Sequence, residues 1–177
     1  NNLEENSSRA FELSQIKEIP KKKEQTIPYR HLVTLSQSKE SVDEIEKTLI
    51  RTGDISELNK TEKDKLESRV KCIEGWISNH APESVKFEIQ EKPPSINFSK
   101  EDLKRIEELK EQMGNINWSP EKIHDSFYEL QEKYNTPAKE YFRIMYLTIL
   151  GKERGPRLGF FLATIEQKFV VERLNSY

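Results

Sequence analysis

The chain has 177 residues and a mass of 20.9 kDa, enough for one domain or two small ones. Hydrophobic and charged residues each make up 34% of it, and 29 basic residues nearly balance 31 acidic ones, for a net charge of -2. Full disorder needs low hydrophobicity together with a large net charge, so near neutrality argues against it. The single cysteine, Cys72, excludes an internal disulfide, and no apolar run approaches the roughly 20 residues of a membrane span.

The first 35 residues differ in composition from the rest of the chain. Lysines outnumber acidic residues between Lys17 and Arg30, and Pro20 and Pro28 bracket this stretch. The pattern predicts a connecting segment over residues 1–35. Its last residues, 29–35, are expected to form the start of the first helix. The start of the chain lacks methionine and a signal pattern, so we expect a piece of a longer cytoplasmic protein.

Residues 36–95 predict a first helical subdomain. Ser41 with Glu44 forms a capping box for a helix that ends at Gly53. Apolar residues spaced three and four apart predict a second helix over residues 61–79. Residues 85–90 alternate apolar and polar side chains, which indicates a short extended piece, and Pro93-Pro94 marks a break near residue 95.

Residues 96–177 repeat the helical pattern and predict a second subdomain. Ser99, Ser119 and Thr136 are placed to begin helices, and Gly114 and Gly151 to end them. Helical periodicity predicts elements over residues 99–114, 119–134, 136–151, 158–165 and 167–174. Strand signals are nearly absent, so the fold class is all-α.

The sequence offers no catalytic or metal-binding constellation. His31, His80, His124 and Cys72 are scattered, without the short spacing that metal ligands or a Cys–His pair would need. Neither common glycine-rich phosphate loop is present. We therefore expect no catalytic residue, no metal and no bound cofactor within this chain.

One turn is distinctive, because residues 151–159 combine three cations, three glycines and a proline between two apolar helices. Lys152, Arg154 and Arg157 lie in the turn, and Arg143 lies on the preceding helix. Arginine forks onto phosphate groups and base edges, which favours a nucleic-acid contact. The alternative is an ordinary turn whose arginines pair with local carboxylates.

The same turn carries a family resemblance. Tyr141-Phe142-Arg143, the string Gly151-Lys152-Glu153-Arg154-Gly155-Pro156-Arg157-Leu158-Gly159 and the ending Phe169-Val170-Val171-Glu172-Arg173-Leu174 resemble the C-terminus of class I lysyl-tRNA synthetases. A looser likeness runs from Tyr29-Arg30-His31-Leu32 onward and includes Trp76 and Trp118. Glutamyl-tRNA synthetases have a related ending.

The resemblance implies two small helical subdomains that form an α-helix cage for the tRNA anticodon. The parent enzyme would activate lysine with ATP and Mg²⁺ and transfer it to tRNA-Lys. Its His-Ile-Gly-His and Lys-Met-Ser-Lys-Ser motifs do not occur here, so the fragment alone should be inactive. Residues 1–35 would then connect to the missing catalytic part, and we expect a monomer.

By resemblance and charge, the candidate tRNA-binding residues are Arg154, Arg157, Lys152 and Arg143, with Trp118 and Tyr134 as stacking candidates. Two alternatives to a lysyl-type cage stay open. One is the same region of a glutamyl-type enzyme, and the other is a helical protein-interaction module without an RNA role.

Overall fold

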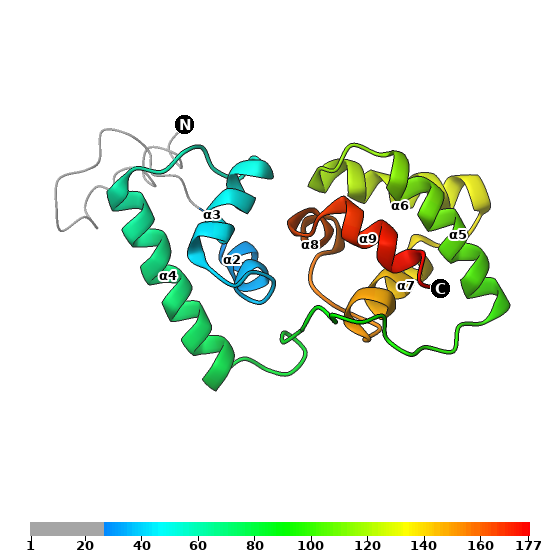
Figure 1. The fold of residues 1–177 in the computed structure, drawn as a ribbon, viewed down its shortest axis with the longest axis horizontal. Coiled ribbons are helices and arrows are strands. Elements are labelled where there is room, and N and C mark those ends of the chain that lie inside the picture. The colour runs from blue at the N-terminus through cyan, green and yellow to red at the C-terminus, as the bar shows by residue number, and fades with distance from the viewer. Residues whose placement is uncertain (1–26) are drawn as a thin grey trace, which may run out of the picture.

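The computed structural model describes residues 27–177, and all regular secondary structure in that range is helical (Figure 1). The predicted all-α class is therefore confirmed. Most of the expected connecting segment, residues 1–26, lies outside the described residues. The helices are α2 (Tyr29–Ser36), α3 (Val42–Arg51), α4 (Lys60–Asn79), α5 (Lys100–Asn115), α6 (Pro120–Tyr134), α7 (Ala138–Leu150), α8 (Leu158–Thr164) and α9 (Gln167–Leu174).

Side-chain caps set where most of these helices begin. The hydroxyls of Ser41, Ser99 and Ser119 accept hydrogen bonds from the first turns of α3, α5 and α6. Asn59 and Glu62 form a capping box that starts α4 one residue earlier than the apolar pattern predicts. Gly151 ends α7 in the left-handed conformation. Gly114 does not stop α5, which runs on to Asn115.

The first group of helices, α2, α3 and α4, surrounds its own buried cluster. The apolar faces that periodicity predicted are turned into it, and α4 contributes Leu66, Val70 and Ile73. One member comes from far along the chain, because Phe160 of α8 is also buried there. The buried cluster of the first group is therefore completed by a residue from the second half of the sequence.

The second group, α5, α6, α7 and α9 together with most of α8, surrounds a larger buried cluster. Helix α7 lies at its centre, with Tyr141, Ile144 and Met145 fully buried. The Tyr141 hydroxyl donates to the carboxylate of Glu108 on α5 at 2.6 Å, so this buried polar pair is satisfied. Phe87, from the segment between the groups, packs into the same cluster.

The two groups meet along α8, which faces α2 in Figure 1. Phe160 and Phe161 are adjacent in sequence, but the first is buried in one cluster and the second in the other. The guanidinium of Arg51 on α3 donates to the Ala163 carbonyl at 2.7 Å and adds a polar tie across the junction. The segment that returns from α4 to α5 crosses the same junction and is held to α9 by Arg173, which donates to the Glu91 carbonyl at 3.1 Å.

Candidate nucleic-acid interface

The cationic turn, residues 151–157, is packed tightly onto the second group of helices. A Cβ atom on Gly155 would lie 2.8 Å from the Tyr146 ring, so only glycine fits there. The Tyr146 hydroxyl donates to the Pro156 carbonyl, and burial raises the pKa of Tyr146 to about 12, which keeps that donor protonated. A Cβ on Gly159 would meet the Pro120 carbonyl oxygen at 2.7 Å. These glycines therefore serve the protein's own packing.

Arg154 and Arg157 project from this turn and are exposed. Neither forms a hydrogen bond or ion pair with any other residue of the described range 27–177. Their guanidinium groups keep all of their donors available for a ligand. Local pairing with carboxylates, the alternative that the sequence left open, does not occur for these two arginines within that range.

Lys152 and Arg143 differ from these two arginines, because each has an intramolecular partner. Lys152 donates to the Lys86 carbonyl at 3.1 Å but stays exposed. Arg143 binds the Asp102 carboxylate at 2.5 Å and the Glu140 carboxylate at 3.4 Å. Burial opposes ionisation of Asp102, but hydrogen bonds from Ser99 and the charge of Arg143 together lower its pKa. Arg143 thus joins α7 to the first turn of α5, which is a structural role.

The two stacking candidates from the sequence are not among the residues that line the cavities around the turn. The Trp118 indole donates to the Ile165 carbonyl at 2.8 Å, and its ring packs against the second cluster. Tyr134 also packs there, and Lys133 lies 4.9 Å from its ring centre. Tyr134 ends α6, and the rise of an α-helix puts it about 21 Å from Pro120, the end of α6 that approaches α8. Tyr134 is thus far from the end of α6 that lies beside the turn, and in the described range neither Trp118 nor Tyr134 lines a cavity with Arg154 or Arg157.

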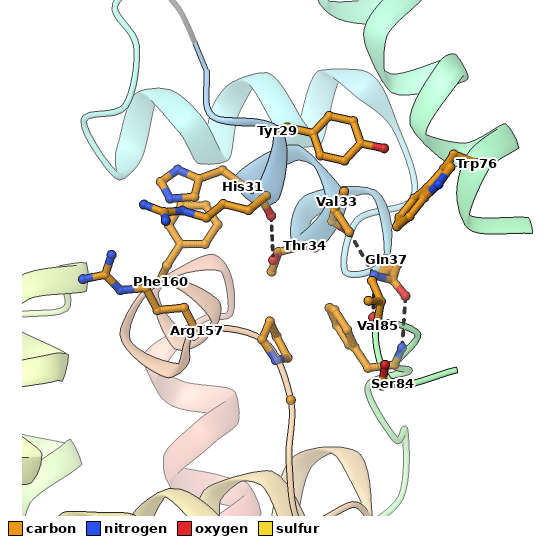
Figure 2. A pocket seen from close by; sticks show the side chains of 14 residues that line it. Tyr29, His31, Val33, Thr34, Gln37, Trp76, Ser84, Val85, Arg157 and Phe160 are labelled. Atoms are coloured by element: carbon orange, nitrogen blue, oxygen red, sulfur yellow. Dashed lines mark hydrogen bonds between the residues drawn. The ribbon is translucent and has the colours of Figure 1, made fainter. Parts of the chain in front are cut away.

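A cavity of about 340 Å³ lies beside the turn and is hereafter the aromatic cavity (Figure 2). Its walls are α2, Trp76 near the end of α4, the segment Ser84–Phe87, and residues 155–160. The volume falls at the low end of the range for small-molecule sites, roughly 300–1,000 Å³. Arg157 lies at its wall, so a cation borders an apolar space.

Aromatic rings line this cavity in two pairs. Tyr29 and Trp76 meet edge to face, with ring centres 5.9 Å apart, and Tyr29 is half exposed. His31 stacks on Phe160, with ring centres 3.8 Å apart and planes 15° from parallel. Sequence reasoning did not select these residues for the site. Trp76 lies three residues after Ile73, beside the apolar stripe of α4, and only tertiary packing brings it to Tyr29.

His31 is held in place by polar contacts as well as by stacking. Its Nδ1 lies 3.1 Å from a carboxylate oxygen of Asp54, whose other oxygen accepts from the Thr52 hydroxyl at 2.5 Å. Burial lowers the pKa of His31, which outweighs the attraction of Asp54, and the positive charge of Arg157 acts in the same direction. A neutral imidazole is thus favoured beside Phe160 and Arg157.

On the other side of the segment Ser84–Phe87 lies a second, open depression of about 580 Å³, hereafter the cationic groove. Lys86, Lys152 and Arg154 line it. Two carboxylates, Glu83 and Glu153, also line it, and Glu83 is bound to the Lys86 ammonium at 2.9 Å. This hydrogen bond and the charge of Lys86 lower the pKa of Glu83. Cations in an open groove bind phosphates, and an aromatic cavity accepts an unstacked base, so the two together suit single-stranded nucleic acid.

Within residues 27–177 no group of three or more His, Cys, Asp and Glu side chains is arranged to hold a metal ion. No helix in that range is long and apolar enough to cross a membrane.

The sequence matches a known family over the second half of the chain. Residues 78–177 match the anticodon binding domain family, and that match covers more than half of the chain. The chain therefore belongs to the anticodon-binding domain family.

Its relatives indicate the enzymes in which such a domain occurs. The lysine–tRNA ligase of Pyrococcus horikoshii is 34% identical over 178 residues, which covers 97% of this chain and 33% of the relative. That of Thermoplasma acidophilum is 33% identical over 150 residues, covering 85% and 29%. The chain spans about a third of the length of these curated relatives.

Among solved structures, a glutamate tRNA ligase from Elizabethkingia meningosepticum matches with a TM-score of 0.44 and 20% identity, over 84% of this chain and 30% of the other. A TM-score this low supports no argument about fold or function.

The lowered pKa of His31 gives a testable pH dependence. In the unfolded chain the His31 imidazole has a pKa near 6.5, so it binds a proton more readily there than in the folded protein. The free energy of unfolding should therefore decrease as pH falls below about 6.5, until the folded-state pKa is passed. His31→Gln removes the titrating group and should make this decrease shallower in denaturant titrations between about pH 7 and pH 5. A variant profile parallel to the wild-type profile would contradict the assignment.

Proposed function

We propose that this chain is the anticodon-binding region of a class I lysine–tRNA ligase and that it recognises the anticodon of lysine-accepting tRNA. In the intact protein a separate catalytic part would activate lysine with ATP and Mg²⁺ and transfer it to the tRNA. The chain by itself would then be inactive in charging, and the intact enzyme would act as a monomer in the cytoplasm.

One observation carries the proposal. The exposed arginines Arg154 and Arg157, which have no hydrogen-bond or ion-pair partner within residues 27–177, lie on a closely packed turn between an aromatic cavity and a cationic groove. Recognition of single-stranded RNA needs these same two elements, because unstacked bases bind aromatic surfaces while cations hold the phosphates. The similarity to lysine–tRNA ligases over nearly the whole chain supports lysine-accepting tRNA as the ligand.

The direct test titrates the intact protein with a lysine-accepting tRNA transcript and with the same transcript carrying an altered anticodon. We expect the altered transcript to bind more weakly and both affinities to fall with salt. Charging assays with lysine and with glutamate separate the lysyl-type from the glutamyl-type enzyme. Equal binding of both transcripts, together with no charging by lysine, would refute the proposal.

The role of the turn is tested by the double variant Arg154→Ala, Arg157→Ala. If both arginines bind phosphates, the slope of log affinity against log salt should become shallower by about 1.4, or about 0.7 for each phosphate that is no longer neutralised. A matched control is Lys104→Ala, Lys168→Ala, which removes two exposed cations from α5 and α9. An unchanged slope in the arginine variant, or an equal change in the control, would remove the turn from the interface.

The aromatic residues are tested by comparing two tryptophans. Trp76→Leu keeps apolar volume on α4 but removes the stacking surface, so tRNA binding should weaken by about 1–3 kcal/mol. Trp118→Leu removes the hydrogen bond to Ile165, so it should lower the free energy of unfolding by roughly 1 kcal/mol. It should leave tRNA affinity unchanged in the folded protein. The reverse pattern would favour Trp118 as the stacking residue.

A further inference from the structure

The aromatic cavity and the cationic groove share a wall. Ser84, Val85 and Phe87 line both depressions, together with Gly155 of the turn. The position of the segment Ser84–Phe87 therefore sets the width of both spaces, and with it the relation between a base bound on one side and a phosphate bound on the other.

Gln37, at the C-terminal end of α2, holds this wall from the cavity side (Figure 2). Its side-chain nitrogen donates to the Val85 carbonyl at 3.4 Å, and its side-chain oxygen accepts from the Phe87 amide at 3.0 Å. A residue of a parallel strand bonds its neighbour in this way, through the carbonyl of one residue and the amide two residues on. The Gln37 carboxamide thus makes the two hydrogen bonds that one residue of a neighbouring parallel strand would make to the segment Ser84–Phe87.

Gln37 is itself fixed to its helix. The same side-chain nitrogen donates to the Val33 carbonyl at 3.1 Å, so both of its hydrogens are engaged within the protein. A carboxamide with both donors occupied presents little to a ligand but transmits the position of α2 to the wall.

Lys152 holds the wall from the groove side. Its ammonium donates to the Lys86 carbonyl, which points the opposite way from the groups that Gln37 binds. Phe87 anchors the end of the wall, because its buried ring meets Phe161 edge to face at 5.3 Å. A continuous set of contacts therefore runs from α2 through Gln37 and the wall to Lys152 in the cationic turn.

We propose that Gln37 is a positioning residue for anticodon discrimination, which holds the wall Ser84–Phe87 so that base and phosphate bind in a single relative placement. This inference rests on the proposed function. Gln37 lines the aromatic cavity, but its hydrogen-bond donors are engaged within the protein, so its removal should affect the choice between anticodons more than the number of phosphates bound.

The test uses Gln37→Met and Gln37→Glu in the intact protein. Methionine keeps the length of the side chain and removes all three hydrogen bonds, whereas glutamate keeps only the acceptor for Phe87. Each variant is titrated with lysine-accepting tRNA and with the anticodon-altered transcript at several salt concentrations. Gln112→Met is the matched control, because this glutamine bonds Glu129 at 2.7 Å on the α5–α6 surface.

We divide the dissociation constant of the altered transcript by that of the lysine-accepting tRNA. This ratio should fall roughly fivefold to tenfold in both Gln37 variants, which corresponds to the free energy of about one net hydrogen bond. The salt slope of Gln37→Met should match the wild type, because this substitution changes no charge. A purely structural role would lower the folded fraction and weaken both transcripts equally, leaving the ratio unchanged, and that result overturns the inference. A wild-type protein that does not distinguish the transcripts would also overturn this inference, and if it fails to charge with lysine as well, the proposed function is overturned with it.

Discussion

The packing of α8 between the two groups of helices is the interaction on which the candidate site depends. Phe160 and Phe161 follow each other in sequence, yet each is buried in a different apolar cluster. Each buried phenylalanine contributes about 1.5–3 kcal/mol of hydrophobic stabilisation, so neither group can move far from α8 without exposing one of them. The turn that carries Arg154 and Arg157 leads directly into this helix. The ring of Phe160 also stacks on the imidazole of His31. The same packing therefore joins the two groups and positions the interface.

Arginine is used in two different ways in this molecule, which reconciles a net charge of -2 with a nucleic-acid interface. Some guanidinium groups bind the protein itself: Arg51, Arg69 and Arg173 donate to backbone carbonyls, and Arg143 pairs with carboxylates. These side chains provide hydrogen-bond partners for backbone carbonyls and for a buried carboxylate. Arg154 and Arg157 have no such partner within residues 27–177, so both guanidinium groups remain available to an anionic ligand although the net charge is negative. Recognition then depends on local charge, and net charge carries little information about the ligand.

How far the sequence could predict the site is clearest from the two tryptophans. The family resemblance included both tryptophans, but only Trp118 was a stacking candidate, and in the structure its indole is bonded to Ile165 and packed against the second cluster. Trp76 follows the core stripe of α4, and its ring partner at the cavity, Tyr29, is 47 positions earlier in the chain. Periodicity reports which face of a helix is buried but not which long-range neighbour leaves part of that face open. The stacking surface was therefore beyond the reach of local patterns, whereas the arginines, which stand in a turn with unusual composition, were not.

The sequence by itself determined the helices, the serine caps of α3, α5 and α6 and the cationic turn, because these depend on residues three or four positions apart. It also determined the all-α class and, through the string from Gly151 to Gly159, the family. Only the tertiary structure decided which cations remain unpaired, because Asp102 is 41 positions from Arg143 and the Lys86 carbonyl is 66 from Lys152. The aromatic cavity and its wall were decided in the same way. They arise where α2, α4, α8 and the segment Ser84–Phe87 converge, and such convergence follows from the packing of two cores, which no local pattern encodes.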